Sequence, residues 1–201
     1  AAGLANGQSF AGTVNSETLI GTVGKDTFTP GAGNDTIDGG HALDTVVFSG
    51  SRSSHTITHS GTGNEAVLTV SGEVDGTDIL SHIERLKFDD GVLAFDTSGN
   101  AGQTYRLYQA ALNRTPEKAG LTDWVHGMDN GLTLTQVAHG FIASAEFQRL
   151  YGANPSNTDF INLLYSNVLH RSADQYGADY WNNQLGSGVS KEQVLIGFSE
   201  S

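Results

Sequence analysis

The chain has 201 residues, a formal net charge of −12 and no cysteine, which excludes disulfides. An acidic chain of this kind is a poor partner for nucleic acid and for anionic membrane surfaces, because both repel it. No apolar run approaches the roughly 18 residues that a membrane-spanning helix needs, and the length allows one or two domains.

Residues 1–11 are predicted to form a linker, as expected for a piece of a longer protein. Four nine-residue units follow in residues 12–47, with the sequences GTVNSETLI, GTVGKDTFT, PGAGNDTID and GGHALDTVV. Their sixth position is acidic and their eighth is apolar. This spacing is typical of a parallel β-roll, in which each unit forms one turn and one short strand. Units on the same side of the roll are therefore two units apart.

The spacing also predicts calcium sites between stacked turns. Ca²⁺ takes about six to eight oxygen ligands, which is more than one turn can supply. We expect Asp26 to stack with Asp44, and Glu17 with Asp35, while glycines let main-chain carbonyls face inward. The expected metal-binding residues of the roll are Glu17, Gly24, Asp26, Gly31, Gly33, Asp35, Gly40 and Asp44. The alternative is a loop rich in glycine and aspartate that binds no metal.

Three residues depart from the repeat pattern and weaken its outer units. Asn15 and Ala42 stand where glycine is usual, and Glu17 stands where aspartate is usual. We therefore expect one or two calcium ions, held by the turns of Asp26 and Asp44 and by the turn of Asp35.

Residues 48–100 are predicted to form an antiparallel β cap that covers the last edge of the roll. Alternation of apolar and polar residues predicts strands, and residues 79–84 are expected to form a helical turn. The predicted strands are residues 45–48, 55–58, 66–70, 86–88 and 92–95. His55 and His59 lie four apart on a strand and are expected to be surface or cross-strand residues.

Acidic residues in the turns of this cap are candidates for a further calcium site. Asp75 and Asp78 are the main candidates, together with Asp89 and Asp90. The alternative is that these residues only cap the main chain of their own turns.

The C-terminal half contains an internal duplication. The segment LYQAALNRTPEKAGLTDW at 107–124 recurs as LYSNVLHRSADQYGADYW at 164–181, an offset of 57. This predicts a duplicated helical domain over residues 101–201, with repeats at about 103–152 and 160–201. Thr133 and Ser190 are predicted N-caps of the third helix in each repeat. The predicted fold class is thus α+β: a short parallel β-roll with a β cap, followed by an all-α helical repeat domain.

The nonapeptides resemble the RTX, or hemolysin-type, calcium-binding repeats of exported bacterial proteins. The segments IERLKFDDG (83–91) and NAGQTYRLYQ (100–109) resemble the junction at which such repeats precede a helical domain of unknown function. That domain recurs in large secreted or surface-associated bacterial proteins. The resemblance implies Ca²⁺ as the cofactor, export by a type I secretion system, folding on contact with external calcium, and a secreted, extracellular or cell-surface location.

These patterns favour a non-catalytic calcium-binding module that serves calcium-induced folding, secretion and cell-surface attachment or assembly. Its expected partners are calcium and a cell-surface polysaccharide or another surface protein. One alternative is a calcium-dependent carbohydrate-binding module that uses Trp124, Trp181, Tyr176 and Tyr180. Another is the C-terminal accessory region of a secreted hydrolase. No catalytic residue is predicted, because the sequence lacks G-x-S-x-G, H-E-x-x-H, a cysteine nucleophile and a phosphate-binding loop.

Overall fold

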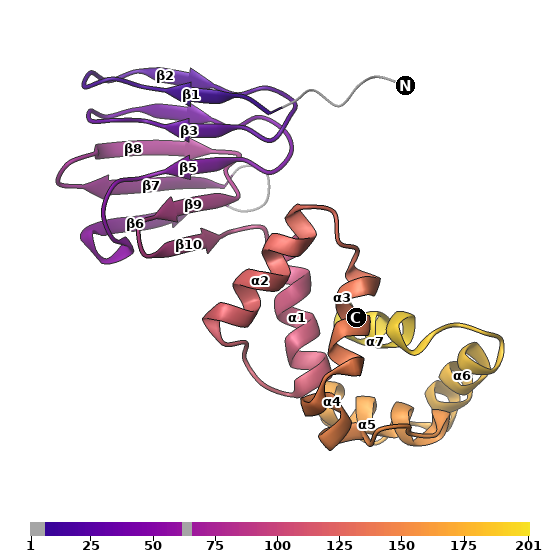
Figure 1. The fold of residues 1–201 in the computed structure, drawn as a ribbon. Coiled ribbons are helices and arrows are strands. Elements are labelled where there is room, and N and C mark those ends of the chain that lie inside the picture. Colours follow the sequence, from indigo (N-terminus) through magenta and orange to yellow (C-terminus); the bar gives the residue numbers. More distant parts are fainter. Residues whose placement is uncertain (1–6, 62–65) are drawn as a thin grey trace. The chain divides into compact units, whose positions relative to one another are not determined.

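The computed structural model describes residues 7–61 and 66–201 and divides the chain into two compact units, Ala1–Asp96 and Thr97–Ser201 (Figure 1). Over the described residues, the first unit is built from β-strands and the second from α-helices, so the fold class is α+β as predicted. Each unit has its own hydrophobic core. None of the helices within these residues is long and apolar enough to cross a membrane.

The first five strands form the parallel roll that the nonapeptides predict. They are β1 (Ser9–Ala11), β2 (Thr18–Ile20), β3 (Thr27–Thr29), β4 (Thr36–Asp38) and β5 (Thr45–Val47). Strands β1, β3 and β5 pair in parallel in one sheet, while β2 and β4 pair in the other. Leu19 lies opposite Ile37 and Phe28 opposite Val46, so the register is two nonapeptides. The apolar eighth residues fill the space between the sheets.

Two later strands extend the roll by a further coil. Strand β8 (Gly76–Ser81) pairs in parallel with β4, and β9 (Arg85–Phe88) pairs in parallel with β5. Their buried residues Leu80 and Leu86 lie opposite Ile37 and Val46 and continue the two inward apolar rows.

Antiparallel strands complete both sheets beyond this coil. Strands β7 (Val67–Gly72) and β6 (His55–Ser60) follow β8, and β10 (Gly91–Ala94) follows β9. A short 3₁₀ helix, η1 (Arg52–Ser54), precedes β6.

The structure corrects two predictions for this half. Residues 9–11 form strand β1 and not a linker, because Phe10 stacks on Phe28 with ring centroids 5.0 Å apart and so joins the core. Residues 7–8 precede this strand without regular structure, and residues 1–6 of the predicted linker lie outside the described residues. Residues 79–84 do not form a helical turn, since β8 runs through Ser81 beside β4. The cap is therefore partly a parallel coil of the roll and partly antiparallel.

The helical unit contains seven helices and repeats its geometry at the offset of 57. Helices α1 (Asn100–Leu112) and α2 (Lys118–Asp129) correspond residue for residue to α5 (Asn157–Leu169) and α6 (Gln175–Gly186). Helix α3 (Leu134–Ala143) corresponds to α7 (Lys191–Ser199), and both begin with a capping box, at Thr133 and Ser190. Helix α4 (Ala145–Tyr151) follows α3.

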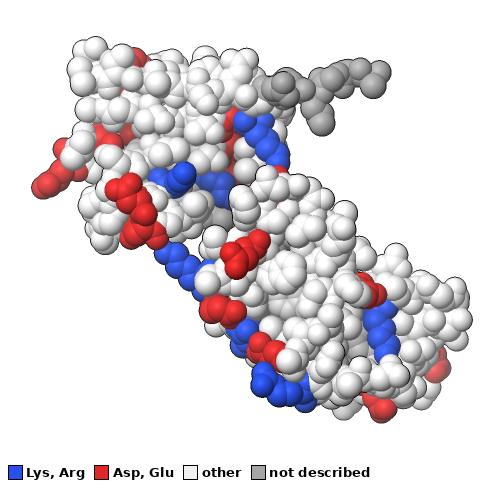
Figure 2. All heavy atoms as spheres, in the orientation of Figure 1, with Lys and Arg blue, Asp and Glu red and all other residues white. Residues whose placement is uncertain are grey.

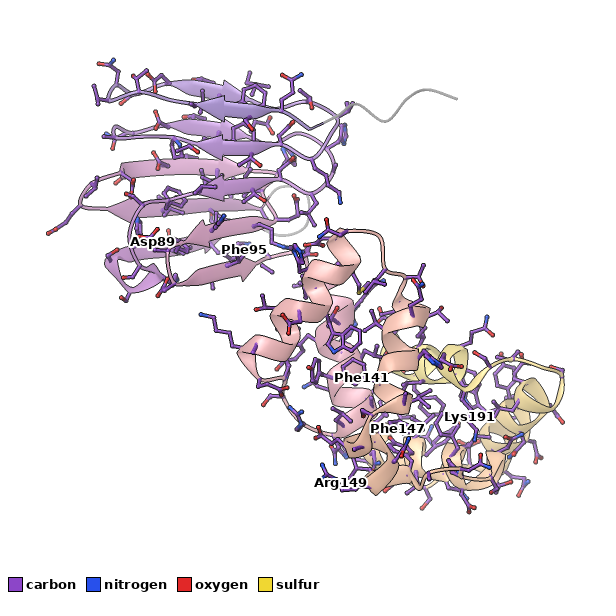
Figure 3. The ribbon with its side chains drawn as sticks, in the orientation of Figure 1. Asp89, Phe95, Phe141, Phe147, Arg149 and Lys191 are labelled. Atoms are coloured by element: carbon purple, nitrogen blue, oxygen red, sulfur yellow. The ribbon has the colours of Figure 1, made fainter. Side chains whose placement is uncertain are left out.

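The same aromatic contact occurs within each of the two repeats. Trp124 stacks on Phe141 in the first repeat, at 5.6 Å between ring centroids, and Trp181 packs on Phe198 in the second, at 5.3 Å. Both indoles are partly buried against the core of the helical unit. Figure 3 shows Phe141 on α3 and Phe147 on α4, and both side chains are buried in this core.

Ala42 has a backbone conformation that suits glycine. Its φ is +81°, whereas the equivalent residue of the preceding unit, Gly33, has a φ of +121°. A left-handed conformation costs an alanine roughly 1–2 kcal/mol because Cβ approaches the neighbouring carbonyl. The fourth turn is thus strained by its one departure from the glycine pattern.

We therefore expect Ala42→Gly to stabilise the roll. Relief of the strain outweighs the extra chain entropy of glycine in the unfolded state, for a net gain of roughly 0.5–1 kcal/mol. Hydrogen exchange of peptides from residues 18–48 measures this gain directly. Ala32→Gly, in the same type of turn but with no positive φ to relieve, is the control, and equal effects of the two substitutions contradict the strain argument.

Candidate metal site in the roll

Acidic side chains form two columns that run along the roll across its successive coils. The Asp44 column contains Asp26, Asp44 and Glu84. The Asp26 N–H donates to Asp44 Oδ1 at 2.7 Å, and the Asp44 N–H donates to Glu84 Oε2 at 2.8 Å. Each carboxylate therefore accepts a hydrogen bond from the coil before it.

The Asp35 column has the same geometry with Glu17, Asp35 and Asp78. The Glu17 N–H donates to Asp35 Oδ1 at 2.7 Å, and the Asp35 N–H donates to Asp78 Oδ1 at 2.8 Å. The structure thus brings together both pairs expected from the sequence, Asp26 with Asp44 and Glu17 with Asp35. It adds one further acidic residue to each column.

Three inner carboxylates are buried with one oxygen unsatisfied. Asp35, Asp44 and Asp78 are at most 1 % exposed. The Oδ2 atom of each accepts no hydrogen bond from any residue in the described part of the chain. Burying a polar atom without a partner costs roughly 1–3 kcal/mol, and more when it is charged. A positive charge placed beside these three Oδ2 atoms would therefore lower the cost of burying them.

The outer carboxylates differ because threonine satisfies them. Thr13 donates its N–H to Glu17 Oε2 at 2.9 Å, and the Thr22 hydroxyl donates to Asp26 Oδ2 at 2.9 Å. These threonines occupy the second position of their nonapeptides, where the third and fourth units have Gly31 and Gly40. A glycine there supplies no hydroxyl, so the aspartate of its unit keeps an unsatisfied oxygen.

The pKa values follow the same division. Burial, together with the negative charge of Glu84 and other nearby carboxylates, raises the pKa of Asp44 to about 7. Burial and the charge of Asp35 raise the pKa of Asp78 to about 6. Burial also acts on Asp26, but hydrogen bonds from Gln8 and Thr22 outweigh it and lower the pKa of that carboxyl. Negative charge is therefore unfavourable at the inner positions and tolerated at the outer one.

Main-chain carbonyls lie beside these carboxylates. A Cβ atom added to Gly39 would lie 2.7 Å from Asp44 Oδ2 and still closer to the carbonyl oxygen of His82. A Cβ added to Gly21 would meet Asp26 Oδ2 at 2.8 Å and the carbonyl oxygen of Gly39. Only glycine fits at these positions, and the two nearest atoms at each are oxygens, which suit a hard cation such as Ca²⁺.

The glycines named in the sequence analysis have different conformations. Gly31, Gly33 and Gly40 adopt φ values of +89°, +121° and +89°, as inward-turning carbonyls require. Gly24 does not have a positive φ, and its N–H donates to the Thr22 hydroxyl at 3.1 Å. Across residues 7–61 and 66–201, no three acidic or histidine side chains converge on one point. A cation in the roll would therefore depend on main-chain oxygens for much of its coordination.

Asp75 lies outside the two columns. Its Oδ1 accepts a hydrogen bond from the Ser49 hydroxyl at 2.9 Å, and its Oδ2 lies 2.8 Å from Nε2 of His55. His55 has the second of its two expected positions, that of a cross-strand residue opposite Gly72 on β7, and it is buried between the rings of Phe48 and Phe88. Asp75 is therefore not a member of the Asp35 column, although its charge contributes to the raised pKa of Asp78.

Asp89 and Asp90 bind main-chain groups of a turn. They accept hydrogen bonds from the N–H groups of Gly50, at 3.1 Å, and Arg52, at 2.8 Å. Both residues thus cap a turn that lies 39 and 38 residues earlier in the chain, and not the main chain of their own turn as the alternative in the sequence analysis expected.

Glu84 was not predicted as a site residue from the sequence. Asp78 was named there, but it was not placed in the same column as Asp35. Residues 76–80 read G-T-D-I-L and repeat the G-N-D-T-I of residues 33–37, so Asp78 carried a signal. Glu84 carried a weaker one, because only the acidic residue two places before Leu86 matches the pattern of Asp44 and Val46, and no glycine accompanies it.

Fold and site together define a β-roll with oxygen-lined turns, joined to a duplicated helical unit. The family described as Domain of unknown function (DUF4214) matches residues 100–151 and again residues 138–201. The two matches span the helical unit and just over half of the chain, and the chain belongs to this family.

Comparisons with curated proteins and with solved structures add little to this family assignment. No curated protein matches the chain. Among solved structures, the crystal structure of the extracellular lipase LipA from Serratia marcescens is similar with a TM-score of 0.35 and 17 % identity. The match covers 46 % of this chain and only 18 % of the lipase chain.

The raised pKa values predict how the metal-free roll responds to pH. Both values lie above the unfolded aspartate value of about 3.9, so between about pH 4 and pH 7 the folded roll holds protons that the unfolded chain has released. The free energy of unfolding therefore falls as pH rises through this window. We expect a loss of about 1–2 kcal/mol between pH 5 and pH 7.5, after allowance for solvent screening.

Hydrogen exchange of roll peptides in EGTA tests this expectation once intrinsic exchange rates are corrected for pH. Asp44→Asn should flatten the profile. A free energy of unfolding that rises between pH 5 and pH 7.5 would contradict the raised pKa values of Asp44 and Asp78.

Proposed function

We propose that this chain is a non-catalytic calcium-binding module of an exported protein, in which Ca²⁺ completes the folding of the roll. The observation that carries the proposal is the set of three buried, unsatisfied carboxylate oxygens, on Asp35, Asp44 and Asp78. A divalent cation would neutralise this buried charge and give each oxygen a partner.

The residues fit calcium because their donor atoms are hard oxygens. Asp35 and Asp44 would supply charged ligands, and the carbonyls beside the turn glycines would supply neutral ones. Asp78 and Glu84 would serve the last coil, whereas Glu17 and Asp26 would contribute less because threonines already satisfy them. Bound calcium would supply positive charge, and binding free energy would then become folding free energy.

This coupling supports an extracellular location. At the low calcium concentration of a cytosol, repulsion among the inner carboxylates favours the open roll. At millimolar calcium outside the cell, the roll closes. The module would accordingly leave the cell unfolded, through a type I secretion system, and act as a secreted or cell-surface protein.

Attachment or assembly is the role we propose for the helical unit, with a cell-surface polysaccharide or another surface protein as partner. On the face drawn in Figure 2, Lys and Arg alternate with Asp and Glu over this unit. Ion pairs such as that of Arg114 with Glu146 occur on this unit. Because both signs of charge are interspersed on it, such a surface favours a partner with a matching charge pattern over a polymer with charge of one sign. The calcium-dependent roll and this charged surface would serve equally well in the C-terminal accessory region of a secreted hydrolase, the other alternative named from the sequence.

Carbohydrate binding is the second candidate, and it rests on two tyrosines. Trp124 and Trp181 pack on their own core and offer little free ring surface. Tyr176 and Tyr180 lie four residues apart on α6 and are 83 % and 47 % exposed. Calcium-dependent binding to a glycan array that disappears in Tyr176→Ala would support this function, and binding unchanged by that substitution would remove it.

Calcium should stabilise the roll and leave the helical unit unchanged. For calcium at 100 times its dissociation constant, the expected gain is about 2.7 kcal/mol. Hydrogen exchange of residues 18–48 reads the roll. Fluorescence reads the helical unit alone, because both tryptophans and all six tyrosines lie after residue 100.

Two variants separate calcium binding from general charge effects. Asp44→Asn removes a buried charge, so we expect it to stabilise the roll in EGTA and to reduce the gain from calcium. Glu73→Gln makes the same charge change at an exposed residue of the same unit and should behave as wild type. Exchange rates that are the same in EGTA and in millimolar calcium would overturn the proposal.

A further inference from the structure

The turns of the four nonapeptides fall into two classes of main-chain conformation. At the fourth position of a unit, Gly33 and Ala42 have φ values of +121° and +81° in the third and fourth turns. Asn15 and Gly24 occupy this position in the first and second turns and do not have a positive φ. Because glycine adopts positive φ at little cost, Gly24 shows that the conformation of the second turn is not forced by the residue at its fourth position.

The residue at the second position divides the turns in the same way. Gly31 and Gly40 both have a φ of +89° in the third and fourth turns. Thr13 and Thr22 occupy this position in the first and second turns and do not have a positive φ. Positive φ is strongly unfavourable for a β-branched residue. Threonine therefore selects the first class of turn, and glycine permits the second.

In the second turn, threonine holds the carboxylate of its own unit. Thr22 directs both its N–H and its hydroxyl at Asp26 Oδ2, the hydroxyl at 2.9 Å. The Thr22 hydroxyl also accepts a hydrogen bond from the Gly24 N–H at 3.1 Å. Donors with positive partial charge thus surround this carboxylate oxygen, where they satisfy it and leave less attraction for a cation.

The first turn has the same arrangement with a longer acidic residue. The Thr13 N–H donates to Glu17 Oε2 at 2.9 Å, and the Thr13 hydroxyl donates to Glu17 Oε1. The hydroxyl accepts a hydrogen bond from the Asn15 N–H at 3.1 Å. The threonine, and not the length of the acidic side chain, is therefore the common element of this class.

Asp26 and Asp44 form a matched pair that differs at one oxygen. Both side chains are buried, and Oδ1 of each accepts a main-chain N–H of the neighbouring coil at 2.7 Å, from Gln8 and from Asp26. Oδ2 of Asp26 is satisfied by Thr22. Oδ2 of Asp44 accepts no hydrogen bond from the described part of the chain, because Gly40 has no hydroxyl to offer.

We propose that the threonine hydroxyl takes the place of the cation, so that the first two turns close without calcium and only the glycine-type turns bind it. Thr13 and Thr22 are then the residues that determine which turns of the roll are metal sites. Thr22 holds Asp26, and calcium is left to Asp35 and Asp44. The part of this inference that concerns calcium rests on the proposed function, whereas closure of the turn by the hydroxyl does not.

Thr22→Val tests the hydroxyl, because valine keeps the β-branched shape and loses the hydrogen bond to Asp26. In EGTA we expect amide exchange of residues 20–29, corrected for intrinsic rates, to become about tenfold faster or more, as for the loss of one hydrogen bond to a charged group. Thr22→Ser keeps the hydroxyl, and Thr18→Val makes the same change at an exposed residue of β2. Both should stay within about twofold of wild type. Equal exchange rates in Thr22→Val and wild type overturn the proposal.

Thr22→Gly tests the choice of metal site, because it reproduces the second position of the third and fourth units. In EGTA it should lose protection as Thr22→Val does. In millimolar calcium it should regain that protection, so the slowing of exchange on calcium addition should exceed that of wild type by about tenfold. Thr22→Val should not regain it, since its methyl groups stay beside Asp26. Calorimetry should also find more calcium bound per chain in Thr22→Gly than in wild type.

The two variants separate failure of this inference from failure of the proposed function. Equal calcium responses in Thr22→Gly and wild type, where wild type does respond, overturn the assignment of Thr22 as the residue that excludes calcium. Loss of protection in Thr22→Val without a calcium response in any variant overturns the proposed function and supports closure of the turn by the hydroxyl.

Discussion

Buried carboxylates stacked one coil apart are the feature on which the N-terminal unit depends. Each inner aspartate accepts a main-chain hydrogen bond from the neighbouring coil, which fixes the register of the turns. The same stacking places like charges close together in a region from which water is excluded, where their repulsion is strong. The apolar rows of Phe28, Val46 and Leu86 close the roll, while the carboxylates oppose its closure until their charge is balanced.

A threonine or a glycine at one position of the nonapeptide changes this balance. Thr22 satisfies Asp26 with its own hydroxyl, and the pKa of Asp26 is lowered. Gly40 leaves Asp44 unsatisfied, and the pKa of Asp44 is raised to about 7. The residue at this position therefore distinguishes turns whose carboxylate is satisfied within its own unit from turns whose carboxylate keeps an oxygen without a hydrogen bond.

Sequence reasoning succeeded where a periodic pattern maps directly onto geometry. The nonapeptide spacing predicted the opposition of Phe28 and Val46, and the offset of 57 predicted the equivalence of α1 with α5. It failed where the pairing is long-range, because β8 joins β4 across an insertion that contains a hairpin. The burial of His55 was missed for the same reason, since its partner Asp75 lies 20 residues away.

Calcium binding by the inner carboxylates of the roll is the central proposal. Isothermal titration calorimetry of the full chain at pH 6.5, in buffers of different ionisation enthalpy, tests it most directly. Because Asp44 has a pKa of about 7 in the metal-free roll, binding should release protons. The measured enthalpy should then depend on the buffer in wild type and less so in Asp44→Asn. No heat of binding, or binding with the same buffer dependence in Asp44→Asn, would contradict the account.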